Sequence, residues 1–179
     1  DATYPAETLP ILINIANEGN FPTATNTVTI KPNAGVIASV SGAGAATQVF
    51  KIFNSYVTID GSNASGTDRS LTIENTSATT PQVVVIGSTG TTPITNVTIK
   101  NCNIINGVNS SSAVIVSDGA APGTAGYFNN ITIQNNSVQK AYIGVYNIAV
   151  VASGNGNGLL ITGNDLNTSG ANSIRLAGL

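Results

Sequence analysis

The stretch Val97-Thr-Ile-Lys-Asn-Cys-Asn-Ile104 decides the fold, because closely related stretches occupy residues 131–138 and 159–166. Each copy places two apolar residues one position apart, follows them with Asn or Gly, and ends on another apolar residue. Such alternation is typical of a short strand that turns one face to a core. Because Asn and Gly adopt left-handed backbone at low cost, the pattern predicts a chain corner at Asn101, Asn135 and Gly163.

The same alternation also begins at Val28, Val57 and Leu71. Starts at 28, 57, 97, 131 and 159 are separated by 29, 40, 34 and 28 residues, and the longest step contains the polar segment 61–70. If that segment is a loop, the step shortens to 30 residues. Internal periods of this size are typical of solenoids, in which each repeat buries its apolar face against its neighbours. We therefore expect one interior column that contains Ile59, Ile99, Ile133 and Ile161.

A second set of apolar segments lies between these strands, at residues 83–86, 113–116, 142–145 and 173–176. Each turn then carries about three short strands, which predicts an all-β fold: a parallel β-helix of about five coils, forming one domain over residues 1–179. Residues 1–27 are expected to be the first coil or its remnant, and 61–70 and 119–129 to be loops inserted in coils. Because residues 173–179 resemble another strand, we expect the chain to be a segment of a longer helix.

The composition excludes several classes of protein. Lys and Arg number only 6 in 179 residues and the net charge is −2, so a basic patch for nucleic acid is not expected. A mean hydropathy of +0.21 argues against disorder. No apolar run reaches the length of a membrane span. The single cysteine, Cys102, excludes an intramolecular disulfide framework.

Residues 49–63, 71–77 and 97–104 resemble the right-handed parallel β-helix of the pectin-lyase-like superfamily. Together with Ala2-Thr-Tyr4 and the segment 28–35, they are similar to repeat regions of large secreted bacterial surface proteins that carry type IX sorting domains. The resemblance implies a right-handed coil and a secreted, extracellular or cell-surface location. It leaves the activity open, because the superfamily contains lyases, hydrolases and adhesins.

The residues that an enzyme of this superfamily needs are scarce. The chain has no histidine and only 8 acidic residues, with no Asp-Asp or Asp-x-Asp pair. Glycosidases need two carboxylates that face one bond, and a calcium-dependent lyase needs several carboxylates around its metal. Asp118 and Arg175 are expected on one face two coils apart, but a single carboxylate makes a poor calcium site. We therefore expect no catalytic residues, no metal site and no cofactor.

Four other features have a structural explanation beside a functional one. Asp60-Gly61 could supply a ligand, but an Asp that caps the chain as it leaves a strand is the simpler explanation. Cys102 is expected to be a packed, inert thiol rather than a reactive one. The frequent Asn-x-Ser/Thr triplets are better explained by Asn side chains that stack between coils than by glycosylation. An outward column of threonines, ordinary in strands and only remotely an ice-binding surface, is expected at Thr29, Thr58, Thr98 and Thr132.

One cluster is a candidate for binding carbohydrate. On the strand around 142–146 the two-residue period turns Tyr142, Gly144 and Tyr146 outward. Aligning Ile174 with Ile143 places Arg175 beside Gly144, and aligning Val114 with Ile143 brings Asp118 near. Two tyrosines over a glycine floor with a guanidinium alongside would form a stacking platform for a sugar ring. The alternative is a packing surface under the 119–128 loop, or a contact with another chain.

Two classes of function stay open on the sequence alone. The first is a non-enzymatic structural or adhesive module of a secreted or cell-surface bacterial protein, as part of an extracellular fibre. Its partners would be other coils of the same polypeptide or further copies stacked end to end. The second is a carbohydrate-binding or polysaccharide-degrading module, whose partner would be a surface polysaccharide.

Overall fold

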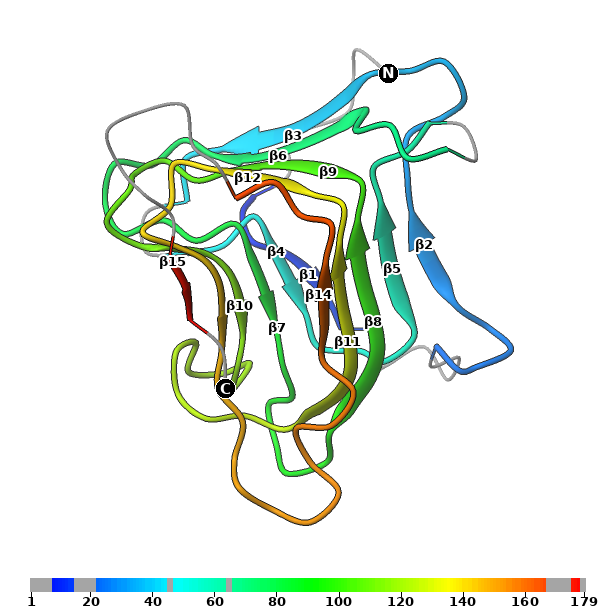
Figure 1. Cartoon of the computed structure of the whole chain (residues 1–179), viewed down its shortest axis with the longest axis vertical. Helices are drawn as coiled ribbons and strands as arrows, with labels where there is room; N and C mark the ends of the chain where they lie inside the picture. The colour runs from blue at the N-terminus through cyan, green and yellow to red at the C-terminus, as the bar shows by residue number, and fades with distance from the viewer. Residues whose placement is uncertain (1–7, 15–21, 45–46, 64–65, 167–174, 178–179) are drawn as a thin grey trace.

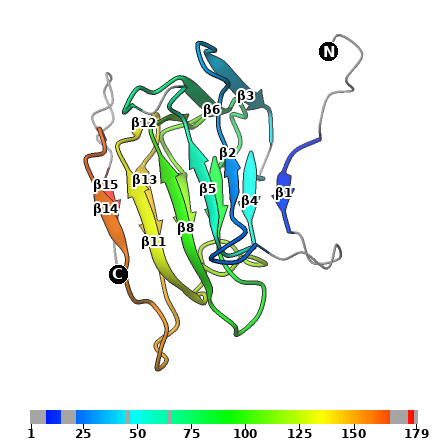
Figure 2. The same cartoon turned by 90° about the vertical axis from the view of Figure 1, so that its right-hand side faces the viewer.

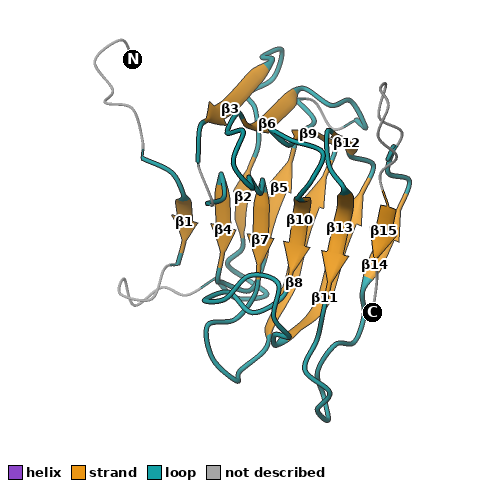
Figure 3. Cartoon of the chain, turned by 90° about the vertical axis from the view of Figure 1, so that its left-hand side faces the viewer, coloured by secondary structure: helices purple, strands orange, loops and turns teal. Residues whose placement is uncertain are grey.

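The computed structural model describes residues 8–14, 22–44, 47–63, 66–166 and 175–177 of the chain. All regular structure in these residues is β-strand, and none of it is a helix long and apolar enough to cross a membrane. The strands form three sheets, which we name A, B and C. Figure 1 shows the sheets as three walls around one interior, while Figures 2 and 3 show the strands of sheets B and A side by side.

Each sheet takes its strands from successive turns of the chain. Sheet A contains β1 (Ile11–Ile13), β4 (Phe50–Ile52), β7 (Val84–Ile86), β10 (Ser112–Val116), β13 (Ile143–Asn147) and β15 (Arg175–Ala177). Sheet B contains β2 (Val28–Ile30), β5 (Val57–Asp60), β8 (Ile94–Lys100), β11 (Phe128–Gln134) and β14 (Leu160–Thr162). Sheet C contains β3 (Ala38–Gly42), β6 (Leu71–Asn75), β9 (Cys102–Ile105) and β12 (Ser137–Gln139).

The chain visits the sheets in the order A, B, C and then returns to A, and every strand pair is parallel. This confirms the predicted all-β parallel solenoid with about three strands per turn. The structure has about four turns, where the sequence predicted about five. The right-handed sense of the coil, which the resemblance implies, stays a prediction.

The interior column of isoleucines is confirmed by the register of sheet B. Ile59 pairs with Ile99, Ile99 with Ile133, and Ile133 with Ile161, while Ile30 continues the column on the other side of Ile59. The three central side chains are fully buried. The alternating residues point outward, so the predicted threonine column also exists, with Leu160 after its last member. The burial of identical residues one above another joins successive coils, in addition to the backbone pairing of their strands.

Left-handed residues mark the corners on both sides of sheet B. Asn101, Asn135 and Gly163 have φ values of 58°, 50° and 63°, which confirms the predicted corner between sheets B and C. Four further residues, each directly before the repeated apolar segment of sheet B, have φ values between 51° and 70°: Tyr56 (59°), Asn96 (58°), Asn130 (51°) and Gly158 (70°). The sequence analysis missed this second corner, although the repeated Asn before Val97 and Ile131 was a signal for it.

Several boundaries and alignments need correction. The loop assigned to 119–129 ends earlier, because Phe128 and Asn129 already belong to β11. In sheet A, Ile143 pairs with Ser112 and with Arg175, so both alignments used for the tyrosine cluster are wrong. The segment 61–70 lies between β5 and β6 without strand in its described residues. Of the expected first coil, residues 1–27, the structure describes β1 and residues 22–27, whereas residues 1–7 and 15–21 lie outside the described residues. Of the expected last strand, residues 173–174 also lie outside them.

Candidate functional site

The two tyrosines of the predicted carbohydrate platform lie in different surroundings. Tyr142 precedes β13, is 47% exposed, and donates its backbone N–H to the Ser111 carbonyl at 2.9 Å. Tyr146 is half-buried, and its hydroxyl donates to the Gly123 carbonyl at 3.4 Å. Tyr146 follows Tyr142 by four positions, with three residues of β13 between them, which is roughly 13 Å along an extended backbone. The two rings therefore do not lie over one sugar ring.

The loop after β10 explains the position of Tyr146. The register of sheet A places Val85, Ile115 and Tyr146 in one outward row, yet Val85 and Ile115 are no more than 3% exposed. Figure 3 shows loops in front of the lower ends of β7 and β10. Tyr146 therefore continues a covered apolar row and contacts the loop with its hydroxyl. This geometry matches the packing alternative for Tyr146.

The remaining members of the predicted platform do not form a polar rim around it. Asp118 accepts hydrogen bonds from the backbone N–H groups of Ala120 and Ala121, each at 2.8 Å, and so holds its own loop together. Gly144 is buried in β13. The backbone of Arg175 lies opposite Ile143 rather than Gly144, and its side chain lies outside the described residues. Of the five residues, the structure brings Tyr146 and Asp118 to the same loop and leaves Tyr142 apart from them.

Asp60 is the most heavily bonded carboxylate at the corner between sheets B and C. Its Oδ1 accepts from the Ser62 N–H at 3.0 Å, the Ser62 hydroxyl at 2.8 Å and Asn101 Nδ2 at 2.7 Å. Its Oδ2 lies 3.2 Å from Lys100 Nζ. Burial opposes ionisation, but the hydrogen bonds and the Lys100 ammonium outweigh it and lower the pKa of Asp60 below its ordinary value. The side chain therefore caps the chain as it leaves β5, as the sequence predicted.

The inserted segment 61–70 is fastened to the following coils by Arg69. The guanidinium donates from Nε to the Asn135 carbonyl at 2.8 Å and from Nη2 to Asn135 Oδ1 at 3.1 Å. Asn135 Nδ2 in turn donates to Asn101 Oδ1 at 2.8 Å and to the Thr67 carbonyl at 2.9 Å. We call Asp60, Arg69, Asn101 and Asn135 the corner network. It ties one loop to two further coils, and the sequence analysis did not identify the part played by Arg69.

Cys102 lies at the next corner position and is part of a second ladder of asparagines. Its backbone N–H donates to Asn136 Oδ1 at 2.9 Å, and the Asn136 N–H donates to Asn164 Oδ1 at 2.9 Å. The thiol is fully buried, and Sγ lies 3.1 Å from the Lys100 carbonyl. Burial raises the pKa of Cys102 to about 12. Because the reactive form is the thiolate, this environment favours an inert thiol.

The acidic side chains of the described residues do not gather into a metal-binding group. No three of their His, Cys, Asp or Glu side chains come together in a way that would hold a metal ion. Asp60 and Asp118 already accept hydrogen bonds from their own turns, and Asp68 accepts from Ser70 and Asn63 in the same way. These three carboxylates therefore hold their own turns in place by accepting hydrogen bonds from them.

The two ends of the solenoid expose what the middle buries. At one end the inward residues Val28, Ile30 and Val40 are only half-buried. At the other end the inward residues Ile161 and Leu166 are only half-buried. The corresponding residues of the central coils, such as Ile59, Ile99 and Ile104, are 0% exposed. Among the described strands β2 and β14 each have a single neighbour in sheet B.

Comparisons of this chain with models of protein families, with curated proteins and with solved structures find no match. The solenoid is therefore assigned from its own strand order and register.

Proposed function

We propose that this chain is a non-enzymatic structural or adhesive module of a secreted or cell-surface protein, and that its open ends are covered by further β-coils. Those coils belong to the same polypeptide or to additional copies stacked end to end. The observation that carries the proposal is the exposure of the solenoid interior at both ends. The finer assignment to the pectin-lyase-like superfamily and to surface proteins with type IX sorting domains is part of the proposal, and the sequence motifs support it.

The physical argument concerns edges. A parallel strand at the end of a sheet presents N–H and C=O groups that another strand can pair with, and uncovered apolar residues beside it add to the attraction. Val28 donates its N–H to the Tyr56 carbonyl, so Val28 faces β5. Alternate residues of a strand direct these groups to opposite sides, so Thr29 directs its N–H away from β5. An incoming coil would extend sheet B by accepting this bond.

The hydrogen bonds and the ion pair made by the acidic side chains support a structural role. Lyase and glycosidase chemistry needs carboxylates that point into a shared open space. Asp60 lies against Lys100 and Asn101, and the carboxylate of Glu74 accepts a hydrogen bond from the Ser41 hydroxyl of the adjacent strand. Reproducible release of reducing or unsaturated ends from an acidic polysaccharide by the purified chain would contradict this part of the proposal.

The test uses the assembly state of the purified chain. Wild-type protein is expected to associate as its concentration rises, measured by light scattering. Thr29→Pro removes the outward N–H without touching the bonds between β2 and β5, so it should shift association to higher concentration while the melting temperature stays nearly constant. Thr29→Val keeps the N–H and serves as the matched control. A protein that stays monomeric over the whole concentration range, with or without Thr29→Pro, would overturn the stacking proposal.

A further inference from the structure

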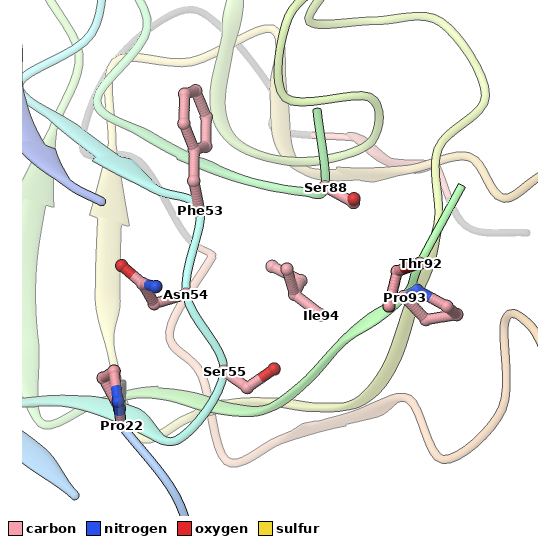
Figure 4. Close-up of a pocket in the computed structure, with 8 residues that line it drawn as sticks. All are labelled: Pro22, Phe53, Asn54, Ser55, Ser88, Thr92, Pro93 and Ile94. Atoms are coloured by element: carbon pink, nitrogen blue, oxygen red, sulfur yellow. The ribbon is translucent and has the colours of Figure 1, made fainter. Parts of the chain in front are cut away.

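A hollow of about 300 Å³ opens where two successive coils turn from sheet A to sheet B. One wall comes from the turn between β4 and β5, and the other from the segment between β7 and β8. Its lining contains Pro22, Phe53, Asn54, Ser55, Ser88, Thr92, Pro93 and Ile94. Figure 4 shows Ile94 between the Ser55 and Ser88 side chains, with Phe53 on one side and Thr92 and Pro93 on the other. Its volume is at the lower end of the range of small-molecule sites.

The lining combines apolar faces with uncharged polar groups. Ile94 is only 6% exposed and forms an apolar floor, while Phe53 adds an aromatic ring. Among the described residues of the lining, the polar groups are one amide and three hydroxyls, and none of these residues is charged. An anionic or cationic ligand would lose its hydration here without gaining an opposite charge. The lining chemistry therefore fits a neutral ligand with both an apolar face and a hydroxyl edge.

Backbone contacts fix the two serine hydroxyls in place. Ser55 Oγ accepts from the Thr95 N–H at 2.9 Å, and Ser88 Oγ accepts from the Gly90 N–H at 3.1 Å. A hydroxyl has one donor and two acceptor positions, so each serine keeps its proton for a further acceptor. Neither proton has a partner among the described residues. Groups held in this way bind without a large loss of side-chain entropy.

The loop after β10 supports the same wall. The Gly119 N–H donates to the Ser88 carbonyl at 2.8 Å, which fixes the backbone beside the Ser88 hydroxyl. A Cβ placed on Gly119 would lie 2.9 Å from Cε1 of Phe53, so the glycine lets the ring edge approach closely. Gly119 thus contacts both the backbone of Ser88 and the ring of Phe53.

We infer that this hollow binds a neutral sugar unit of the pyranose class. A pyranose ring has a C–H face that packs on Phe53 and Ile94, and hydroxyls that accept hydrogen bonds from Ser55 and Ser88. The site lies at the turn between sheets A and B, away from Tyr142. It adds a binding activity to the proposed structural role and does not depend on how the ends are covered.

The experiment locates the ligand residue by residue. The isotope-labelled full chain is titrated with the methyl glycosides of glucose, galactose and mannose, and separately with glucuronate, while backbone amide shifts are followed by NMR. A neutral ligand of this size should bind with a dissociation constant of about a millimolar. Saturable shifts are expected at Ser55, Ser88 and Ile94, with glucuronate binding at least several-fold more weakly. No saturable shift with any glycoside, or equal binding of glucuronate, would overturn the inference.

Variants separate this site from the tyrosine surface. Ser88→Ala should weaken binding roughly two- to tenfold, because one hydrogen bond to a neutral ligand is lost. Phe53→Leu keeps an apolar side chain beside Gly119 but removes the ring face, and should weaken binding by a similar factor or more. Thr91→Ala, outside the lining, and Tyr142→Ala should leave binding unchanged. If Ser88→Ala fails to fold, Phe53→Leu and the wild-type shift map still decide; shifts centred on Tyr142 would refute the site.

Discussion

Ile99 and Ile30 occupy the same column of sheet B, but they differ in what covers them. Ile99 is 0% exposed between Ile59 and Ile133, whereas Ile30 is half-buried and has a column neighbour on one side only. The sequence around them is nearly the same, Val-Thr-Ile-Lys in both cases. In a solenoid the stability of a coil is approximately its own contribution plus that of its neighbours. The greater exposure of Ile30 therefore reflects the apolar contacts that a side chain lacks when a neighbouring coil is missing.

The largest expected effect follows from truncating the two isoleucines. Ile99→Ala should lower the free energy of unfolding by about 2–5 kcal/mol, because it removes a fully buried side chain and leaves a cavity. Ile30→Ala should cost about 1 kcal/mol in the monomer, because half of the side chain already contacts solvent. Urea unfolding of both variants beside the wild type measures the difference. Equal losses in a monomeric protein would show that the end of the solenoid is as well packed as its middle.

The second comparison contrasts two asparagines of the ladder that contains Cys102. Asn136 is 0% exposed, accepts from the Cys102 N–H, and donates to the Ile99 carbonyl at 3.0 Å. Asn136→Ala would leave these groups buried without partners, at about 2–3 kcal/mol. Asn164 makes similar bonds at the half-buried end, where water can replace them, so Asn164→Ala should cost about 1 kcal/mol. Thermal unfolding of the two variants checks this order, and the reverse order would contradict it.

A smaller effect is expected from Asp60, and it depends on pH. The folded state lowers the pKa of Asp60, so the ionised carboxylate stabilises the fold above the unfolded pKa of about 4. That stability is lost as the pH falls through the lower pKa of the folded state. Asp60→Asn should therefore be less stable than wild type by about 1 kcal/mol at pH 7, after allowance for solvent near Lys100. The difference should shrink below pH 4; a gap that is constant between pH 7 and pH 3 would contradict the argument.

The parts of the fold that could be predicted are those where one residue type repeats at one position. The column of Ile59, Ile99 and Ile133 follows from a fixed place in a repeated pattern, and burial requires that place to face inward. Asn101 and Asn135 could be placed at a corner because few other residues adopt left-handed backbone. In both cases a local preference and the packing of neighbouring coils favour the same structure.

The register of sheet A could not be fixed in the same way. Val114 pairs with Val145, two positions from the predicted partner Ile143, and a shift of two residues leaves every side chain on the same face. Hydrophobic alternation therefore does not distinguish the two alignments. The shift at Arg175 is one residue, and the bulge between Ile143 and Tyr146 in that strand pair changes the register.

Contacts made by loops were the least predictable. Arg69 reaches Asn135, 66 residues away in sequence, and only the path of the 61–70 segment brings them together. The hollow beside Phe53 likewise depends on two turns whose sequences share no pattern with each other. Composition did indicate that Asn would stack between coils, since an amide can donate and accept at once. Composition could not indicate that the 61–70 segment would contact these stacked asparagines.

The smallest expected effect concerns Gly163, which occupies in the end coil the corner that Asn101 and Asn135 occupy in the middle. Its φ of 63° is close to theirs, and an added Cβ would meet nothing nearer than 3.9 Å, from the Asn135 N–H nitrogen. Gly163→Asn reduces the backbone freedom of the unfolded chain, which stabilises the folded state. Asn must also adopt the left-handed conformation in the folded state, which costs a similar amount of free energy. We expect the free energy of unfolding to change by less than about 0.5 kcal/mol. Gly163→Val, whose branched side chain disfavours positive φ, is the control and should lose about 1–2 kcal/mol. If Gly163→Asn is as destabilising as Gly163→Val, the end coil does not share the corner geometry of the middle, and the equivalence of the two regions fails at this position.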